Sequence, residues 1–188
     1  HAVESYITLN WGGDRRCPQM AEDAVRLIVE NVEKAYRDGG DLDARQKLLL
    51  ASYYASYAFT RTGLTYVHCI AHTLGGLYNV PHGLANAVIL PYVLEYNGEL
   101  IHPQLARLAE AAGLEVEGKS VAEKAKAFIE EIKRLNGAMG IPEKFDLIRR
   151  EDAVRMIAWA LEEGNPWYPV PRIFDEKDIE TVIGQITA

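Results

Sequence analysis

The stretch from Gly63 to Asn97 reads GLTYVHCIAHTLGGLYNVPHGLANAVILPYVLEYN, and it sets the expectation for the whole fold. Apolar residues dominate 67–78 and 84–96, so both ranges are predicted to be buried helices. The turn at 79–83 contains Asn, Pro and Gly and separates them. Three histidines, His68, His72 and His82, fall within this one apolar stretch. The chemistry of the chain is therefore expected here.

Helical spacing continues on both sides of this stretch. A helix is predicted over 18–37, because Pro18 stands at its start and Gly39 follows its end. The range 43–59 is apolar on nearly every side and is predicted to be a central, buried helix. The other predicted helices cover 2–7, 104–112, 121–135, 153–161 and the range from 175 onward. Sustained alternation of polar and apolar residues is missing, so we predict an all-α helical bundle of about seven to nine helices.

Prolines interrupt the pattern near the end of the chain. Pro166, Pro169 and Pro171 exclude helix interior from 165–171. This segment is predicted to be a loop that is packed by its aromatic side chains, Trp167 and Tyr168.

Length and composition favour one water-soluble domain. The chain has 188 residues, of which 48% are hydrophobic and 25% are charged, as in an average globular protein. A formal net charge of −7 without a Lys/Arg cluster argues against nucleic acid or an anionic membrane as a partner. Cys17 and Cys69 lack any disulfide or C-x-x-C pattern, and no apolar run is long enough to span a membrane. We expect a cytoplasmic protein.

The three clustered histidines point to a metal site. Imidazole is the commonest neutral ligand of divalent transition metals, and His68, His72 and His82 lie within one fifteen-residue window. Spacing alone selects His68 and His72, since residues four apart share one face of a helix. The H-E-x-x-H zinc protease motif does not apply, because Cys69 stands where the general base would be. Cys69 is interpreted as a packing residue.

A resemblance to a known family rests on a much longer pattern. The segment 63–97 is similar to the second signature of the iron-containing (group III) alcohol dehydrogenases, with the histidines at 68, 72 and 82 and the string Val80-Pro81-His82-Gly83-x-Ala85-Asn86. The opening His1-Ala2-x-Glu4-x-Tyr6 resembles the tail of the first signature. The likeness covers essentially the whole chain and implies the dehydroquinate-synthase-like C-terminal helical domain, 1–188, of such an enzyme. Residues 2–7 lack an N-cap side chain before them, so we expect the first helix to be cut at His1.

The resemblance also implies roles for individual residues. His1, His68 and His82 become metal ligands, together with an Asp four positions before His1 that lies outside this chain. His72 becomes the catalytic residue that relays the alcohol proton beside the metal. This assignment replaces the pair chosen from spacing. A loop with Gly75, Gly76 and Pro81 is expected to bring His82 round to face His68.

The implied chemistry is alcohol and aldehyde interconversion. A divalent iron or zinc ion polarises the substrate oxygen while hydride passes between a small alcohol or aldehyde and NAD(P). Gly75-Gly76 is no dinucleotide-binding fingerprint, so the cofactor is expected to bind to an N-terminal domain absent from this chain. The isolated chain is then expected to be inactive, and the full-length enzyme is a possible homodimer.

Two other interpretations stay open. One is a fragment of a glycerol-dehydrogenase-like or dehydroquinate-synthase-like zinc enzyme, although the segment 80–86 favours the alcohol dehydrogenase branch. The other is a non-catalytic helical module whose histidines are structural or only bind metal.

Overall fold

The computed structural model describes residues 1–9, 14–165 and 167–188. Within these ranges the chain forms nine α-helices and two 3-10 helices, and its only strand-like pairing is an isolated bridge between Phe145 and Thr187. The all-α prediction is therefore confirmed. In chain order the elements are α1 (Ala2–Ile7), α2 (Cys17–Arg37), α3 (Leu42–Thr62), α4 (Tyr66–Tyr78), α5 (His82–Asn97), η1 (Gly98–Ile101), α6 (His102–Ala111), α7 (Val121–Ala138), η2 (Arg150–Asp152), α8 (Ala153–Gly164) and α9 (Glu176–Ile186).

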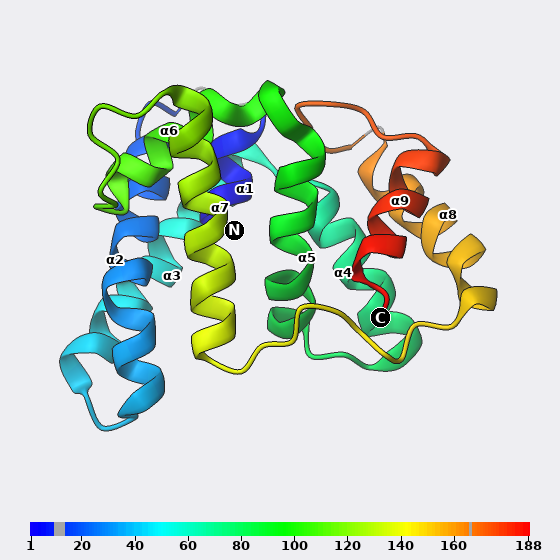
Figure 1. The fold of residues 1–188 in the computed structure, drawn as a ribbon, viewed down its shortest axis with the longest axis horizontal. Helices are drawn as coiled ribbons and strands as arrows, with labels where there is room; N and C mark the ends of the chain where they lie inside the picture. Colours follow the sequence, from blue (N-terminus) through cyan, green and yellow to red (C-terminus); the bar gives the residue numbers. More distant parts are fainter. Residues whose placement is uncertain (10–13, 166) are drawn as a thin grey trace.

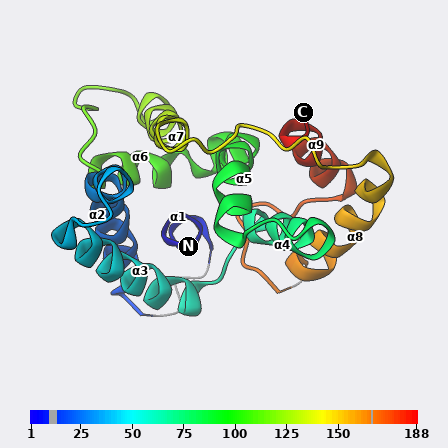
Figure 2. The same ribbon diagram turned by 90° about the horizontal axis from the view of Figure 1, so that it is seen from below.

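Two hydrophobic cores lie side by side along the long axis (Figure 1). The first core is built by α1, α2, α3, α6 and α7, and the second core by α4, α5, α8 and α9. Helix α5 joins them, because Leu94 belongs to the first core, Val93 belongs to the second, and Leu90 packs against both. Seen from below, α1 lies between α3 and α5 (Figure 2). The junction of the two cores therefore brings α1, α4 and α5 together.

Local signals explain the ends of α4 and α5. The Thr65 hydroxyl caps the start of α4 by accepting a hydrogen bond from the Val67 amide, and Asn79 ends the helix in the left-handed conformation with φ 54°. Pro81 then leads directly into α5, which begins at His82. The connection is thus only 79–81, shorter than the predicted turn. Gly75 and Gly76 belong to α4 and form no loop, and a Cβ added at either would meet only ordinary contacts.

Helix α3 is peripheral, which corrects the prediction of a central, buried helix. Only small residues of α3 are buried, namely Ala44, Ala51, Ala55, Ala58 and Thr62. Several of its large apolar side chains face outward, with Leu42, Leu49 and Tyr53 at 76%, 74% and 60% exposed. The helix packs against α2 through the small residues because they let the two backbones approach closely. A uniformly apolar sequence does not reveal which face is buried.

The predicted helix starts agree with the structure better than the predicted burial of α3. Ser120 with Glu123, and Asp175 with Asp178, form complete capping boxes at the starts of α7 and α9. The described residues of 165–171 form no helix, as predicted. Of the two aromatic residues expected to pack the segment, Tyr168 packs against the second core, whereas Trp167 is 77% exposed. Pro166, which is predicted to belong to the same loop, lies outside the described residues.

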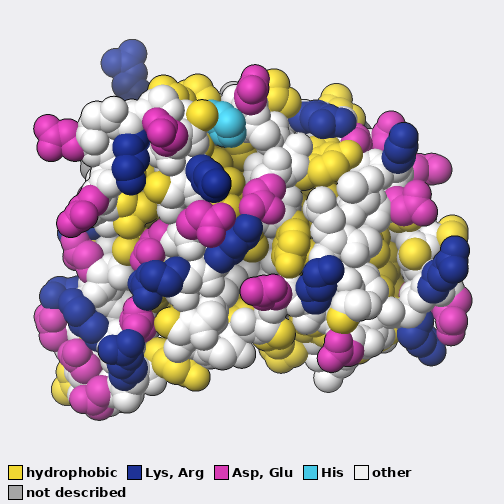
Figure 3. Space-filling view, viewed as in Figure 1, with side chains coloured by type: hydrophobic (Ala, Val, Ile, Leu, Met, Phe, Trp, Pro, Cys, Tyr) yellow, Lys and Arg dark blue, Asp and Glu magenta, His cyan; other side chains and the backbone are white. Residues whose placement is uncertain are grey.

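Charged side chains of both signs are interspersed over the face seen in Figure 3. Lys or Arg pairs with a nearby Asp or Glu at many positions, for example Lys124 with Glu110 at 2.6 Å. None of the described helices is long and apolar enough to cross a membrane.

Candidate metal and proton-transfer site

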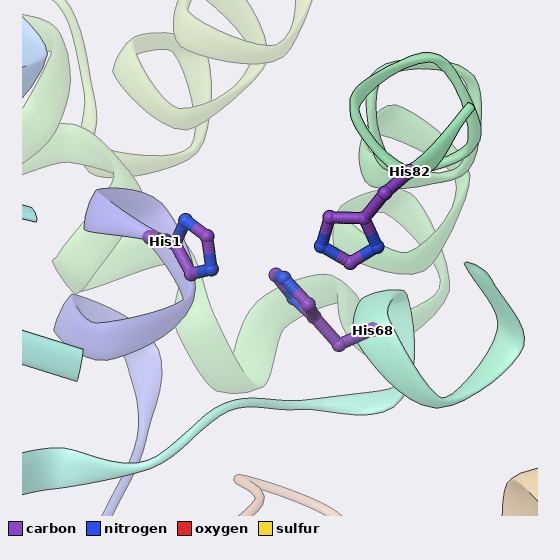
Figure 4. Close-up of side chains that lie close together, drawn as sticks. All are labelled: His1, His68 and His82. Carbon is purple, nitrogen blue, oxygen red and sulfur yellow. The ribbon is translucent and has the colours of Figure 1, made fainter. Parts of the chain in front are cut away.

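Three histidines from three separate helices converge at the junction of the two cores (Figure 4). His1 immediately precedes α1, His68 lies in the first turn of α4, and His82 begins α5. Each offers a ring nitrogen, and these three nitrogens lie within 4.8 Å of one another. In the part of the chain that the structure describes, these residues form the one group of metal-capable side chains.

His68 is the buried member of the cluster, and Glu4 holds it. Its side chain is 3% exposed, and its Nδ1 hydrogen-bonds to Oε2 of Glu4, which is 2% exposed. The other carboxylate oxygen, Oε1, accepts from the Thr65 amide at 2.9 Å and from the Thr65 hydroxyl at 2.7 Å. Burial pushes the pKa of Glu4 up, but the hydrogen bonds from His68 and from the Thr65 hydroxyl hold it below its usual value. The carboxylate therefore keeps its charge inside the protein.

The free nitrogen of His68 fits a metal ligand. Nε2 is buried and has no hydrogen-bond partner among the described residues. Buried polar atoms normally have a partner, so this orphan requires an explanation. An imidazole whose Nδ1–H is fixed by a carboxylate presents an unprotonated Nε2, which is the arrangement of metal-binding histidines. The residues present thus fit a divalent metal with nitrogen ligands.

His1 and His82 complete the cluster from the surface. Both are exposed. The ring of His1 stacks on Phe59 at 4.2 Å, and the rings of His68 and His82 are 5.1 Å apart. Partial desolvation of its ring, followed by the nearby His68 and His72, lowers the pKa of His82. A lowered pKa favours the neutral imidazole that metal binding needs.

His72 lies one turn beyond His68 and has different surroundings. Its side chain is 44% exposed, and it is outside the group of three. Its Nδ1 is 2.8 Å from Oε1 and 2.9 Å from Oε2 of Glu163, at the end of α8. The His72 ring stacks beside that of His82, with 5.3 Å between their centroids. The geometry therefore separates His72 from the ligand-like histidines while keeping it next to them.

Sequence reasoning missed the residues that hold the histidines. Glu4 stands in the opening motif that carried the resemblance, but spacing along the chain does not connect it with His68, 64 residues later. Glu163 had no signal at all, because 91 residues separate it from His72. Cys69 was interpreted correctly as packing, since it is fully buried and its thiol donates to the Thr65 carbonyl.

Comparison with known proteins agrees with this architecture. Residues 1–187 match the family model described as "Fe-containing alcohol dehydrogenase family, C-terminal". The chain belongs to the iron-containing alcohol dehydrogenase family. The resemblance of the histidine-rich segment to this family is therefore confirmed. The expected fold, that of the family's C-terminal domain, is confirmed as well.

Named members of the iron-containing alcohol dehydrogenase family are similar over most of the chain. The 1,3-propanediol dehydrogenase of Citrobacter freundii is 39% identical over 98% of this chain, and the lactaldehyde reductase of Escherichia coli (strain K12) is 37% identical over 88%. A crystal structure of 1,3-propanediol oxidoreductase has 38% identity and a TM-score of 0.92 over 99% of this chain and 48% of that one. The chain spans about half the length of these relatives, 48% and 44% of the two enzymes.

Proposed function

We propose that this chain is the single, metal-binding C-terminal domain of a metal- and NAD(P)-dependent dehydrogenase for small alcohols or aldehydes. Family membership and the half-length match to a propanediol dehydrogenase and a lactaldehyde reductase support the proposal. The observation that carries it is His68, whose Nδ1 is held by buried Glu4 while its buried Nε2 has no partner and belongs to a three-histidine group.

His1, His68 and His82 would hold an iron or zinc ion. Their nitrogens lie within 4.8 Å, somewhat wider than the roughly 3–4 Å that ligand distances near 2.0–2.1 Å require. Because His1 and His82 are exposed, small rotations of their rings can close the difference. When bound, the metal supplies Lewis-acid polarisation of the substrate oxygen, and NAD(P) accepts or donates hydride. Three neutral ligands leave the ion's charge uncompensated, so a carboxylate from outside this chain would strengthen binding.

His72 would move the substrate proton. In alcohol oxidation the hydroxyl proton passes to Nε2 of His72, and in aldehyde reduction Nε2 returns it. The position of His72 beside His82, outside the three-histidine group, supports this role over that of a ligand. Its 44% exposed side chain can exchange the proton with solvent afterwards.

The dinucleotide would bind to a domain that precedes His1 in the intact polypeptide. The described residues of this chain form no strand, so they contain no strand–turn–helix phosphate site. The relatives are about twice as long, which leaves room for a nucleotide-binding half. Assembly of the intact enzyme as a homodimer is part of the same proposal.

The test compares the intact polypeptide with residues 1–188 alone. Each is freed of metal, reloaded with Fe²⁺ or Zn²⁺, and assayed for NADH or NADPH formation from 1,3-propanediol and 1-butanol. We expect turnover from the intact protein only. Steady turnover by residues 1–188 alone would contradict the assignment of cofactor binding to another domain. Metal binding without turnover in the intact protein would instead favour a non-catalytic metal module.

A further inference from the structure

The Glu163 carboxylate contacts His72, and the proposed function assigns it no role. Glu163 lies in the last turn of α8 and approaches His72 Nδ1 with both oxygens, at 2.8 and 2.9 Å. The Tyr168 hydroxyl donates to Oε1 of Glu163 at 2.7 Å. Burial of Tyr168, together with its bond to Glu163, raises the pKa of this phenol, so it stays a donor. Glu163 is therefore held between Tyr168 and His72.

The packing of α8 on α4 fixes this carboxylate in place. Gly164 follows Glu163, and a Cβ at Gly164 would lie 2.6 Å from Cε1 of Tyr66 and 3.2 Å from Sγ of Cys69. Only glycine permits this close approach, since a real Cβ does not tolerate such a distance. The end of α8 is thus pressed against the first turn of α4, so the neighbouring Glu163 lies beside His72, in the second turn.

The hydrogen-bond chemistry defines the state of the His72 ring. A carboxylate only accepts hydrogen bonds, so the Nδ1 that contacts Glu163 must carry the proton. The neutral ring then has its lone pair on Nε2. A histidine in the other tautomer would present N–H at Nε2 and could not accept a substrate proton there.

We propose that Glu163 is a positioning residue that holds His72 in the Nδ1–H tautomer, with Tyr168 supporting Glu163. The inference rests on the proposed function for the role of His72, but the tautomer itself does not depend on activity. The alternative is that His72 and Glu163 form a surface ion pair that does not affect proton transfer. His72 and Glu163 are 44% and 29% exposed, and pairs of this kind contribute little to folding stability. Removing Glu163 should therefore leave the fold intact.

The first test measures the tautomer directly. Ring ¹⁵N shifts of His72 are recorded in the zinc-loaded intact protein, in buffer alkaline enough to keep imidazoles neutral, and His72→Gln assigns the signal. We expect a protonated Nδ1 in the wild type and a shift toward protonated Nε2 in Glu163→Gln, whose amide can donate to Nδ1. A wild-type ring protonated at Nε2, or an unchanged ring in Glu163→Gln, would overturn the proposal.

The second test uses kinetics of the same variants. Glu163→Gln should lower kcat about 10- to 100-fold, less than loss of the acid–base group itself, with KM and metal content unchanged. Glu163→Asp should recover part of the loss, and Tyr168→Phe should have a smaller effect in the same direction. The neighbouring, exposed Glu162 is the matched control, and Glu162→Gln should behave as wild type. Equal kcat in Glu163→Gln and Glu162→Gln would overturn the proposal. An inactive wild type would count against the proposed function, while the ring shifts would still test the tautomer.

Discussion

Two consecutive turns of α4 present the same chemical unit in opposite surroundings. In each, a histidine Nδ1 meets a carboxylate, His68 with Glu4 and His72 with Glu163. The first pair is 3% and 2% exposed, whereas the second is 44% and 29% exposed. The two carboxylates come from different helices, Glu4 from α1 and Glu163 from the end of α8.

Burial changes what each pair can do. A buried carboxylate that loses a hydrogen-bond donor is left with an uncompensated charge, so Glu4 and His68 depend on each other for their positions. An exposed pair is screened by water, so His72 and Glu163 can exchange protons with solvent at little cost in stability. The comparison supports a rigid ligand in the first turn and a proton-transfer group in the second.

The largest effect is expected from removing the buried histidine. His68→Ala should empty the metal site of the intact polypeptide and abolish turnover. The substitution also leaves the buried Glu4 carboxylate without its His68 partner, which should destabilise the fold by roughly 3–5 kcal/mol. Metal analysis and chemical denaturation measure both effects. His102→Ala changes the one histidine outside the segment 1–82 and should keep full metal content.

His72→Ala should retain the metal and lose activity. We expect kcat to fall roughly 10²- to 10⁴-fold, as for a lost general acid–base group. Comparing the metal content of His72→Ala with that of His68→Ala decides whether His72 is a metal ligand or a proton-transfer group. Loss of one metal ion per chain would mean that four-residue spacing identifies the ligands and that the resemblance misassigns them.

Glu4→Gln should weaken the metal site without emptying it. The amide keeps the size of the side chain but loses the charge that orients His68 Nδ1–H. Carboxylates behind metal-bound histidines typically contribute 10- to 100-fold in affinity. Competition with a chelator of known affinity measures the change. Glu22 accepts a hydrogen bond from Tyr6 of α1 but lies outside the histidine cluster, so Glu22→Gln serves as the control. Equal affinities of the two variants would contradict the role of Glu4.

The sequence identified the helices and the histidines because both have local signals. Capping boxes at Ser120 and Asp175 and the proline at the start of α2 depend only on nearby residues. The choice of His1, His68 and His82 came from the long family motif. Spacing would have paired His68 with His72, and these are separated by their tertiary surroundings.

What the sequence could not predict depends on contacts between distant segments. The apolar residues of α3 indicated burial, yet its alanines are the buried residues while Leu49 is 74% exposed. Glu4 and Glu163 acquire their roles from helix packing across 64 and 91 residues. A short motif contains no information about such pairings.

The smallest effect is expected at Thr65, which supports the buried pair from behind. Its hydroxyl donates to Glu4 at 2.7 Å and accepts a long, 3.5 Å bond from the Val67 amide at the start of α4. Thr65→Ala removes both, but Glu4 keeps its bonds to the residue 65 amide and to His68. We therefore expect a loss of about 1–2 kcal/mol in unfolding free energy and less than a tenfold loss in metal affinity.

Thr65→Ser keeps the hydroxyl and should restore both quantities to nearly wild-type values. Denaturant titration of the metal-free protein separates the loss of the helix cap from the loss of metal. If Thr65→Ala weakened metal binding as much as Glu4→Gln, the hydroxyl would be as important as the carboxylate itself. Orientation of His68 would then depend on the whole chain of contacts from α4 back through α1, and the contrast with the solvent-exposed His72 would be sharper still.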